Sequence, residues 1–421
     1  MMKKHLLYIL LFTLALGACK KDTTEPVIGN VDDRLSATLT EYQTKLTGAE
    51  FGWRGFLLTD SKVVATFLFS FTDKNRTTMS ADFKPTPAES SYRLKALQRP
   101  TLLFDSYSTL HLLADPTPSV LGGTTGSGYF ADFEFAFLSS SADTIKLEGT
   151  FNKSKLILVR SKSAAENSDA LTSPEAMATT LSKLRTYFKR TTIGGANCEV
   201  RIDVGQNIIG FNYLDAGVMK TVSSSYYVSG TTINLFTPLT VGTATVSELN
   251  GVNFNTGTGF ISASIKGGEA IEIKEAIAPI QYDKTAAQRW FNAPSNGVYW
   301  TCFNGFTVDG VTDAYGIKTI PGFNFLIFYA KFNVAYSRLG FIVGGAYGAY
   351  GPAPIAAFPA DGTIKFTNAG SFGTAPVAIR NIVTNTQNNF FKASGFYVIQ
   401  SGEKSYDLVA LDDARSWISF E

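Results

Sequence analysis

The stretch VVATFLFSFTDKNRTTMSADF, residues 63–83, decides the fold class of this chain. Its two halves, Val63–Phe71 and Thr77–Phe83, are rich in β-branched and aromatic residues, which pack well on a pleated sheet. Residues 73–75 (DKN) lie between the halves and supply the polar residues of a turn. The stretch therefore predicts a β-hairpin, the unit of an antiparallel sheet.

Much of the remaining chain has the same character. It contains 33 Phe, 18 Tyr and 37 Gly, while charged residues make up only 17%, which favours β-sheet over a helical bundle. Further strands are predicted at residues 51–58, 92–97, 101–105, 129–138, 144–148, 155–160, from 198 to about 276, and again after residue 291. We expect an α+β protein, predominantly antiparallel β.

Three helices interrupt the strands. Leucines and a tyrosine at helical spacing predict the first helix from Asp32 or Asp33 to Leu46. Ser173 followed by Pro174 predicts the start of the second, after a polar linker at residues 161–173. The third is predicted over Asp283–Phe291.

The order of these elements predicts two or three β-rich units, each preceded by a short helix. The expected units are residues 31–162, 163–280 and 281–421. Internal repeats would match the first strand after each helix, at residues 51–58, 198–204 and 298–303. The alternative is that β-rich sequences resemble one another through composition alone.

The chain begins MMKKHLLYILLFTLALGACKKD, residues 1–22. Two lysines, a short apolar run and small residues have the layout of a secretory signal peptide over residues 1–18. Leu16–Cys19 resembles the bacterial lipobox, which implies that the Cys19 thiol carries lipid and that residues 19–30 form an anchor and tether. The alternative is an ordinary signal peptide with a chance cysteine. Lysine and an acidic residue after Cys19 also resemble the surface-export signal of Bacteroidetes lipoproteins.

A family resemblance also supports a location in the cell envelope. It rests on residues 31–35 (VDDRL), 52–53 (GW), 92–102 (YRLKALQRPTL), 104–105 (FD), 110–113 (LHLL), 132–135 (DFEF) and 145–149 (IKLEG). These segments resemble the Bacteroidetes lipoproteins grouped as domain of unknown function 4302. The resemblance implies a secreted lipoprotein and no catalytic activity.

Composition excludes several kinds of site and partner. A net charge of +2 gives no electrostatic basis for nucleic-acid binding. His111 is the one histidine left after signal removal, so we expect no histidine-rich metal or haem site and no cofactor. Cys198 and Cys302 either form a disulfide or remain two separate buried thiols. No serine, zinc-protease or phosphate-loop motif is present, so no catalytic residue is assigned.

Two charged groups are candidates for binding. Asp132 and Glu134, two apart in a predicted strand, would share one face and bind a cation or act as acid and base; the alternative is a solvent face. Arg93, Lys95 and Arg99, near Asp105, would form either an anion pocket or a structural ion pair.

The most distinctive segment is GGAYGAYGPAP, residues 344–354. We expect a glycine-rich loop that presents Tyr347 and Tyr350 to a sugar ring or a partner protein, because exposed tyrosines offer rigid amphipathic surface. The alternative is an ordinary loop packed on the sheet.

These observations favour a non-catalytic binding protein on the outer membrane, lipid-anchored and exposed at the surface or at the periplasmic face. It would serve a nutrient uptake system, in contact with a transporter complex or a glycan. A structural or adhesion protein is the alternative, and a hydrolase acting on a polymer is a third hypothesis.

Overall fold

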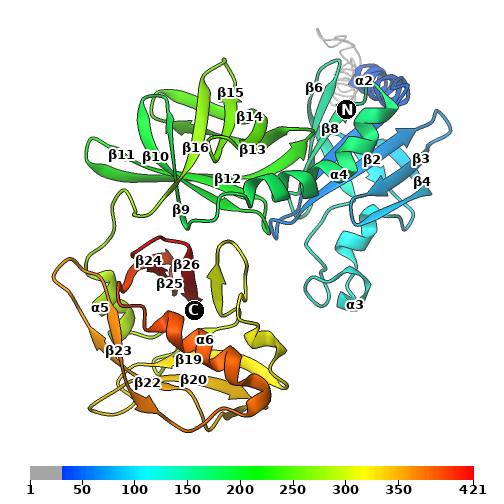
Figure 1. Ribbon diagram of the computed structural model, residues 1–421. Helices are drawn as coiled ribbons and strands as arrows, with labels where there is room; N and C mark the ends of the chain where they lie inside the picture. Colours follow the sequence, from blue (N-terminus) through cyan, green and yellow to red (C-terminus); the bar gives the residue numbers. More distant parts are fainter. Residues whose placement is uncertain (1–30) are drawn as a thin grey trace, which may run out of the picture. The chain divides into compact units, whose positions relative to one another are not determined.

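The structure is a computed structural model that describes residues 31–421 (Figure 1). The fold is predominantly antiparallel β, with 47% of residues in strands and 17% in helices. Contacts divide the chain into two compact units. The first ends at Lys162, and the second holds Ser163–Glu421 together with Phe56–Phe67 and Ala81–Pro85. The signal peptide and Cys19 lie outside the described residues.

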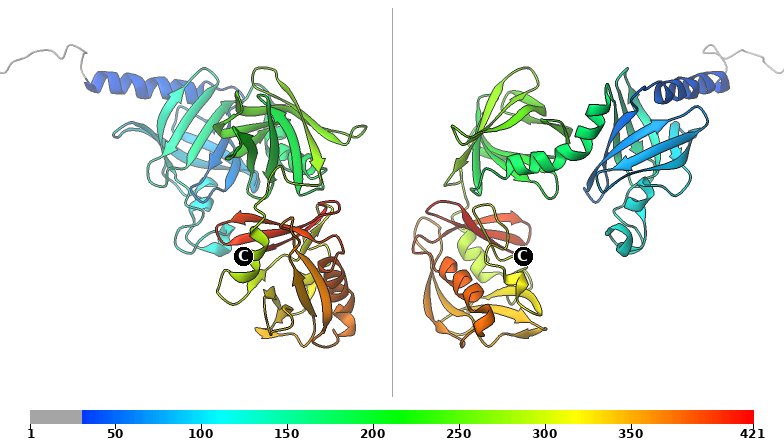
Figure 2. Two further views of the ribbon diagram at one scale, coloured as in Figure 1. Left: turned by 90° about the vertical axis from the view of Figure 1, so that its left-hand side faces the viewer. Right: turned by 45° about the vertical axis from the view of Figure 1, so that its right-hand side comes forward.

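A helix and a closed eight-stranded barrel make up the first part of the chain (Figure 2). The helix α2 spans Val31–Thr47, as predicted, and Trp53 donates a hydrogen bond from Nε1 to the Leu46 carbonyl oxygen at 2.9 Å. The elements that follow are β1 (Trp53–Leu58), β2 (Val64–Phe71), β3 (Arg76–Ala81), β4 (Lys84–Ala96), β5 (Pro100–Phe104), η1 (Leu110–Ala114), α3 (Pro118–Leu121), β6 (Glu134–Ser140), β7 (Thr144–Gly149) and β8 (Lys155–Arg160).

The hairpin predicted at residues 63–83 is confirmed as β2 and β3. Its aromatic residues face inward: the Phe69 and Phe104 rings lie 5.6 Å apart, and both side chains are buried. Burial of such rings is the main stabilising contribution of a β-barrel core.

A second closed barrel follows. Its core contains aliphatic residues from all eight strands, along with Phe211, Tyr226 and the buried Cys198. The strands are β9 (Phe188–Ile193), β10 (Ala196–Asp203), β11 (Ile208–Asp215), β12 (Val218–Ser229), β13 (Thr232–Val241), β14 (Ala244–Asn255), β15 (Phe260–Ile265) and β16 (Ala270–Ala276).

The helix before this barrel starts ten residues earlier than predicted. The helix α4 spans Ala164–Leu181 and packs on β12 and β14. Ser163, not Ser173, is its N-cap, and its Oγ accepts a hydrogen bond from the Glu166 N–H at 3.3 Å. Pro174 lies inside the helix, so the predicted linker at residues 161–173 is wrong. The strong helix formers Ala, Glu and Leu in this stretch outweigh the helix-breaking tendency of one proline.

The last part of the chain, residues 286–420, forms a C-terminal module. It has two four-stranded sheets, β17-β19-β20-β21 and β18-β26-β25-β24, and the two-stranded sheet β22-β23. Its elements are α5 (Ala286–Asn292), β17 (Trp300–Cys302), β18 (Phe306–Val308), η2 (Ile317–Thr319), β19 (Phe323–Tyr329), β20 (Arg338–Val343), β21 (Ala346–Tyr347), β22 (Pro352–Ala357), β23 (Lys365–Ser371), η3 (Val377–Ile379), α6 (Arg380–Phe390), β24 (Phe396–Gly402), β25 (Ser405–Ala410) and β26 (Ser416–Phe420).

An aromatic core holds this module together. Trp290 of α5, the third predicted helix, is fully buried and stacks on Phe328 of β19 at 4.6 Å. Phe366 and Phe390 continue the stack at 4.4 Å. No helix within residues 31–421 has the length and apolar character needed to cross a membrane.

A helix precedes each barrel in the chain, while the C-terminal module has a different sheet arrangement. The predicted repeat matched residues 51–58 with residues 198–204. In the structure these belong to the first strand of one barrel, β1, and to the second strand of the other, β10. The repeats therefore remain a prediction.

Candidate functional site

A row of polar side chains crosses the outside of the second barrel. Arg190 of β9, Glu199 of β10 and Asn212 of β11 are paired in register on neighbouring strands. Their side chains point away from the interior, because the adjacent Cys198 and Val200 belong to the barrel core and side chains alternate along a strand.

Glu199 is the anionic centre of this row, and its side chain is only 6% exposed. Its Oε2 accepts hydrogen bonds from Arg190 Nη1 at 3.1 Å and from the Ile280 N–H at 3.3 Å. Arg201 Nη2 lies 3.7 Å from Oε1. A buried carboxylate is tolerated because these partners replace its lost water. The bond from Ile280 also fixes the segment after β16 against the barrel.

Arg289 of α5 is the corresponding cationic centre in the C-terminal module. It donates from Nη1 to Asp283 Oδ2 at 2.7 Å, from Nη2 to Gln400 Oε1 at 3.0 Å and from Nε to the Tyr406 hydroxyl oxygen at 2.9 Å. A hydrogen bond from Thr285, followed by the one from Arg289, holds the pKa of Asp283 below its usual value.

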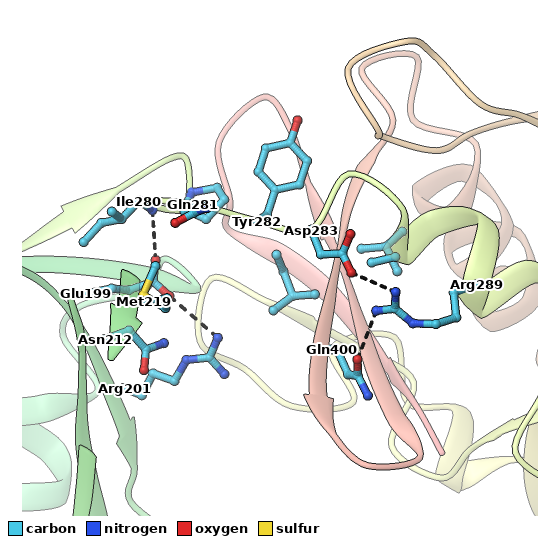
Figure 3. Close-up of a pocket in the computed structure, with 14 residues that line it drawn as sticks. Glu199, Arg201, Asn212, Met219, Ile280, Gln281, Tyr282, Asp283, Arg289 and Gln400 are labelled. Atoms are coloured by element: carbon cyan, nitrogen blue, oxygen red, sulfur yellow. Dashed lines mark hydrogen bonds and ion pairs between the residues drawn. The ribbon is translucent and has the colours of Figure 1, made fainter. Parts of the chain in front are cut away.

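These two centres line a pocket of about 200 Å³ (Figure 3). The polar side chains labelled there include Glu199, Arg201, Asn212, Gln281, Asp283, Arg289 and Gln400. Each carboxylate in the pocket is already paired with an arginine. Little charge is left to attract an ion, so the pocket suits a small neutral molecule held by hydrogen bonds.

The structure separates the two tyrosines predicted to bind together. Tyr347, in the edge strand β21, is 45% exposed. Tyr350 is buried in the core of the C-terminal module, with its ring 5.5 Å from Phe341. The expected exposure is therefore correct for Tyr347 and wrong for Tyr350. The expected loop is a hairpin, in which Gly344 and Gly345 (φ 58° and 79°) form a two-residue turn between β20 and β21.

Tyr347 lies against an arginine that the sequence analysis did not single out. The guanidinium carbon of Arg338 is 4.5 Å from the centre of the Tyr347 ring, 4.3 Å from Phe372 and 5.4 Å from Phe332. Its Nη2 donates to the Gly348 carbonyl oxygen at 3.0 Å. Within residues 31–421 no carboxylate forms an ion pair with Arg338, and desolvation lowers the pKa of its guanidinium.

Two further tyrosines extend this group. Tyr329 of β19 is paired in register with Arg338 of β20, and its ring lies 5.4 Å from Phe332 and 6.4 Å from Tyr299. We call the set Arg338, Tyr347, Phe332, Phe372, Tyr299 and Tyr329 the arginine–aromatic face. The sequence did hold a signal for it, since residues 314–360 contain two lysines and this arginine but no Asp or Glu.

The predicted pair Asp132 and Glu134 does not share a strand face. Glu134 begins β6, whereas Asp132 precedes that strand and is buried. The Asp132 carboxylate accepts hydrogen bonds from the N–H groups of Phe151, Asn152 and Ser154, at 2.8 to 3.0 Å. This carboxylate therefore fixes the turn between β7 and β8, and its acceptor sites are occupied by the chain itself.

The predicted anion pocket is not assembled. Arg93 forms an ion pair with Asp105, whose pKa is lowered first by a hydrogen bond from Ser91 and then by Arg93. Arg99 is exposed between β4 and β5, and among the described residues it forms no ion pair. His111 bonds through Nδ1 to Ser108 Oγ at 2.9 Å.

The two cysteines are free and buried, so the alternative of two separate thiols holds. Cys198 lies in the core of the second barrel and Cys302 in that of the C-terminal module. Burial raises the pKa of Cys198 to about 11 and that of Cys302 to about 12. Within residues 31–421, no group of three or more His, Cys, Asp or Glu side chains is placed to hold a metal ion.

Comparison with known proteins gives one family and distant structural similarities. A family described as domain of unknown function (DUF4302) matches residues 29–255, more than half of the chain. No curated protein matches.

Among solved structures, a DUF3598-family protein of unknown function from Nostoc punctiforme is 10% identical, with 55% of this chain and 96% of that chain covered and a TM-score of 0.16. The DNA polymerase III β subunit from Pseudomonas aeruginosa is 10% identical, with coverages of 92% and 95% and a TM-score of 0.13. The β subunit from Thermotoga maritima is 8% identical, with coverages of 91% and 96% and a TM-score of 0.13. TM-scores this low carry no conclusion about fold or function.

Proposed function

The chain belongs to the DUF4302 family, and we propose that it is a lipid-anchored cell-envelope protein that binds a ligand without transforming it. The observation that carries the binding role is the arginine–aromatic face. Desolvating a guanidinium costs free energy, and no carboxylate of the described chain offsets that cost at Arg338. Such a site is typical of a surface completed by something that the protein binds.

The proposed location at the outer membrane rests on the sequence. The lipobox-like residues 16–19 predict acylation of Cys19, which would make this a lipoprotein of the outer membrane, as in Bacteroidetes. Surface exposure is proposed from the lysines and the acidic residue that follow Cys19. Cys19→Ala should release the protein from envelope membranes and abolish labelling by radioactive palmitate. Membrane retention of an unlabelled wild type would contradict the proposal.

The architecture suits a scaffold for presenting a binding surface. We propose that the two helix-led barrels are internal repeats, because α2 and α4 each precede eight strands. The arginine–aromatic face belongs to the C-terminal module, which has its own sheets and its own aromatic core. A nutrient uptake system at the outer membrane is the setting that we propose for this binding role.

A binding screen tests the role directly. The full-length lipoprotein, purified in mild detergent, should bind at least one class of soluble oligosaccharide, and Tyr347→Ala should weaken that binding by about tenfold through loss of ring stacking. Tyr107→Ala is the matched control, since Tyr107 is 64% exposed and lies in the first compact unit. Binding that is unaffected by Tyr347→Ala would remove the arginine–aromatic face from the proposal.

A further inference from the structure

Basic residues outnumber acidic ones over most of the C-terminal module, although Arg289 pairs with Asp283 and Lys392 pairs with Asp412. Between Lys284 and Gly402 the sequence contains eight Lys and Arg residues, three Asp and no Glu. The three aspartates already have partners. Asp309 pairs with Arg415 at 3.4 Å, Asp313 accepts from the Ile317 N–H at 2.7 Å, and Asp361 accepts from the Thr363 N–H at 3.0 Å.

Two of the basic residues in this segment are Arg338, in the arginine–aromatic face, and Lys331, which lines a pocket together with Tyr329 of that face. Arg338 donates a hydrogen bond from Nη2 to the Gly348 carbonyl oxygen, while its Nη1 forms no hydrogen bond with any described residue. Lys331 follows the end of β19, where its Nζ donates to the neutral Asn292 Oδ1 at 2.8 Å. Neither has a carboxylate partner within residues 31–421. A ligand that carries a carboxylate would supply the missing charge, and a guanidinium is the side chain best suited to bind one.

The groups around Arg338 indicate what else this ligand contains. Tyr299, Tyr329 and Tyr347 offer both flat apolar rings and hydroxyl groups. This combination matches a sugar, which has an apolar ring face and a rim of hydroxyls. A peptide added as an extra strand fits less well, because the edge strand β21 is two residues long and offers few free backbone groups.

We propose that the arginine–aromatic face binds an acidic sugar, with Arg338 on the carboxylate and Tyr347 against the ring. This inference rests on the proposed binding function and specifies its ligand class. The carboxylate should matter more than any single hydroxyl, because it is the group that neutralises Arg338, for which residues 31–421 provide no carboxylate partner.

The test uses three probes that differ in charge and in ring chemistry. The full-length protein in detergent is titrated with a short oligogalacturonate, with the same oligosaccharide fully methyl-esterified, and with a neutral galacto-oligosaccharide. We expect the acid to bind about tenfold or more tightly than its methyl ester, as for a charge-assisted hydrogen bond. This comparison needs no variant, so it does not depend on the folding of one.

Variants then locate the contact. Arg338→Met should reduce binding of the acid to the level of the ester, and Arg338→Lys should recover only part of it, because lysine keeps the charge but not the planar fork. Lys318→Met removes the same charge from an exposed position in η2 and should leave the affinity unchanged within about twofold. Thermal unfolding of each variant confirms that it is folded.

The outcomes separate this inference from the function on which it rests. If acid, ester and neutral sugar bind equally and Tyr347→Ala weakens all three, the carboxylate inference is overturned while the binding function stands. If none binds, both are overturned. If a peptide binds in a manner that requires Arg338, the cation site is correct and the sugar assignment is wrong.

Discussion

Arg289 and Arg338 lie in the same C-terminal module but differ in how completely their guanidinium groups are paired. Arg289 donates to four acceptors of its own chain, one of them the carboxylate of Asp283. Arg338 contacts one backbone carbonyl and three aromatic rings, and no carboxylate of residues 31–421 pairs with it. A fully partnered arginine joins parts of the fold, while a partially partnered one is available to a ligand. The paired side chains around the pocket in Figure 3 therefore contribute to stability, and the arginine–aromatic face is the better candidate for binding a charged ligand.

The largest effect is expected when a fully paired carboxylate, that of Glu199, is removed. Glu199→Ala leaves Arg190 and Arg201 without their carboxylate and should lower the free energy of unfolding by about 2 kcal/mol. Urea denaturation measures the change. Glu272→Ala is the control, since its pair with Lys274 is exposed and should contribute less than about 0.5 kcal/mol. Equal effects for the two variants would show that the buried row has no special role.

Arg338→Met tests the partially paired arginine, again by urea denaturation. The variant loses cation–π contacts and one hydrogen bond, but it also removes a desolvated charge for which residues 31–421 provide no counter-ion. These contributions oppose each other, so the free energy of unfolding should change by less than about 1 kcal/mol. A loss as large as that of Glu199→Ala would mean that Arg338 is a structural residue, and the contrast would fail.

Low pH should weaken the contribution of the Asp283–Arg289 pair to stability. The pKa of Asp283 is lowered in the folded state, so its contribution is present above the usual Asp value of 3.8 and is lost as the pH falls through the lower folded value. Wild type should exceed Asp283→Asn by about 0.5 kcal/mol near neutral pH, a small difference because the Asp283 side chain is half exposed. Urea denaturation at stepped pH should show this difference shrinking in acid; growth of the difference would contradict the prediction.

The smallest expected effect concerns Lys331. Its ammonium group should attract an acidic ligand without a direct bond, so Lys331→Met should weaken oligogalacturonate binding by about twofold at low salt. Raising the salt concentration should abolish the difference by screening. A twofold effect that persists at high salt would indicate direct contact instead.

The sequence predicted local structure well because short-range patterns determine it. The hairpin at residues 63–83 and the helix at residues 31–47 follow from alternation, turn residues and helical spacing. The start of α4 was missed because Ser163 and Ser173 are both plausible caps, and only packing on β12 and β14 decides between them. Closure of each set of eight strands into a barrel depends on pairing between the first and last strands, which no local pattern reveals.

The candidate site was predictable only in part. The glycine-rich setting correctly predicted that Tyr347 is exposed, but the burial of Tyr350 depends on the hairpin that directs its ring toward Phe341. Arg338 was not predicted because its importance lies in the lack of a carboxylate partner within residues 31–421, which is a property of three-dimensional neighbours. The acid-free run at residues 314–360 was the one sequence signal for it.

The two buried thiols can be used to follow the unfolding of the two hydrophobic cores in which they lie. Because Cys198 lies in one hydrophobic core and Cys302 in another, a thiol reagent can reach each only when that core is breached. Pulse labelling followed by peptide mapping would therefore time the loss of the second barrel and of the C-terminal module separately. Neither thiol requires an oxidant to mature, so the same chain should fold alike in reducing and oxidising compartments.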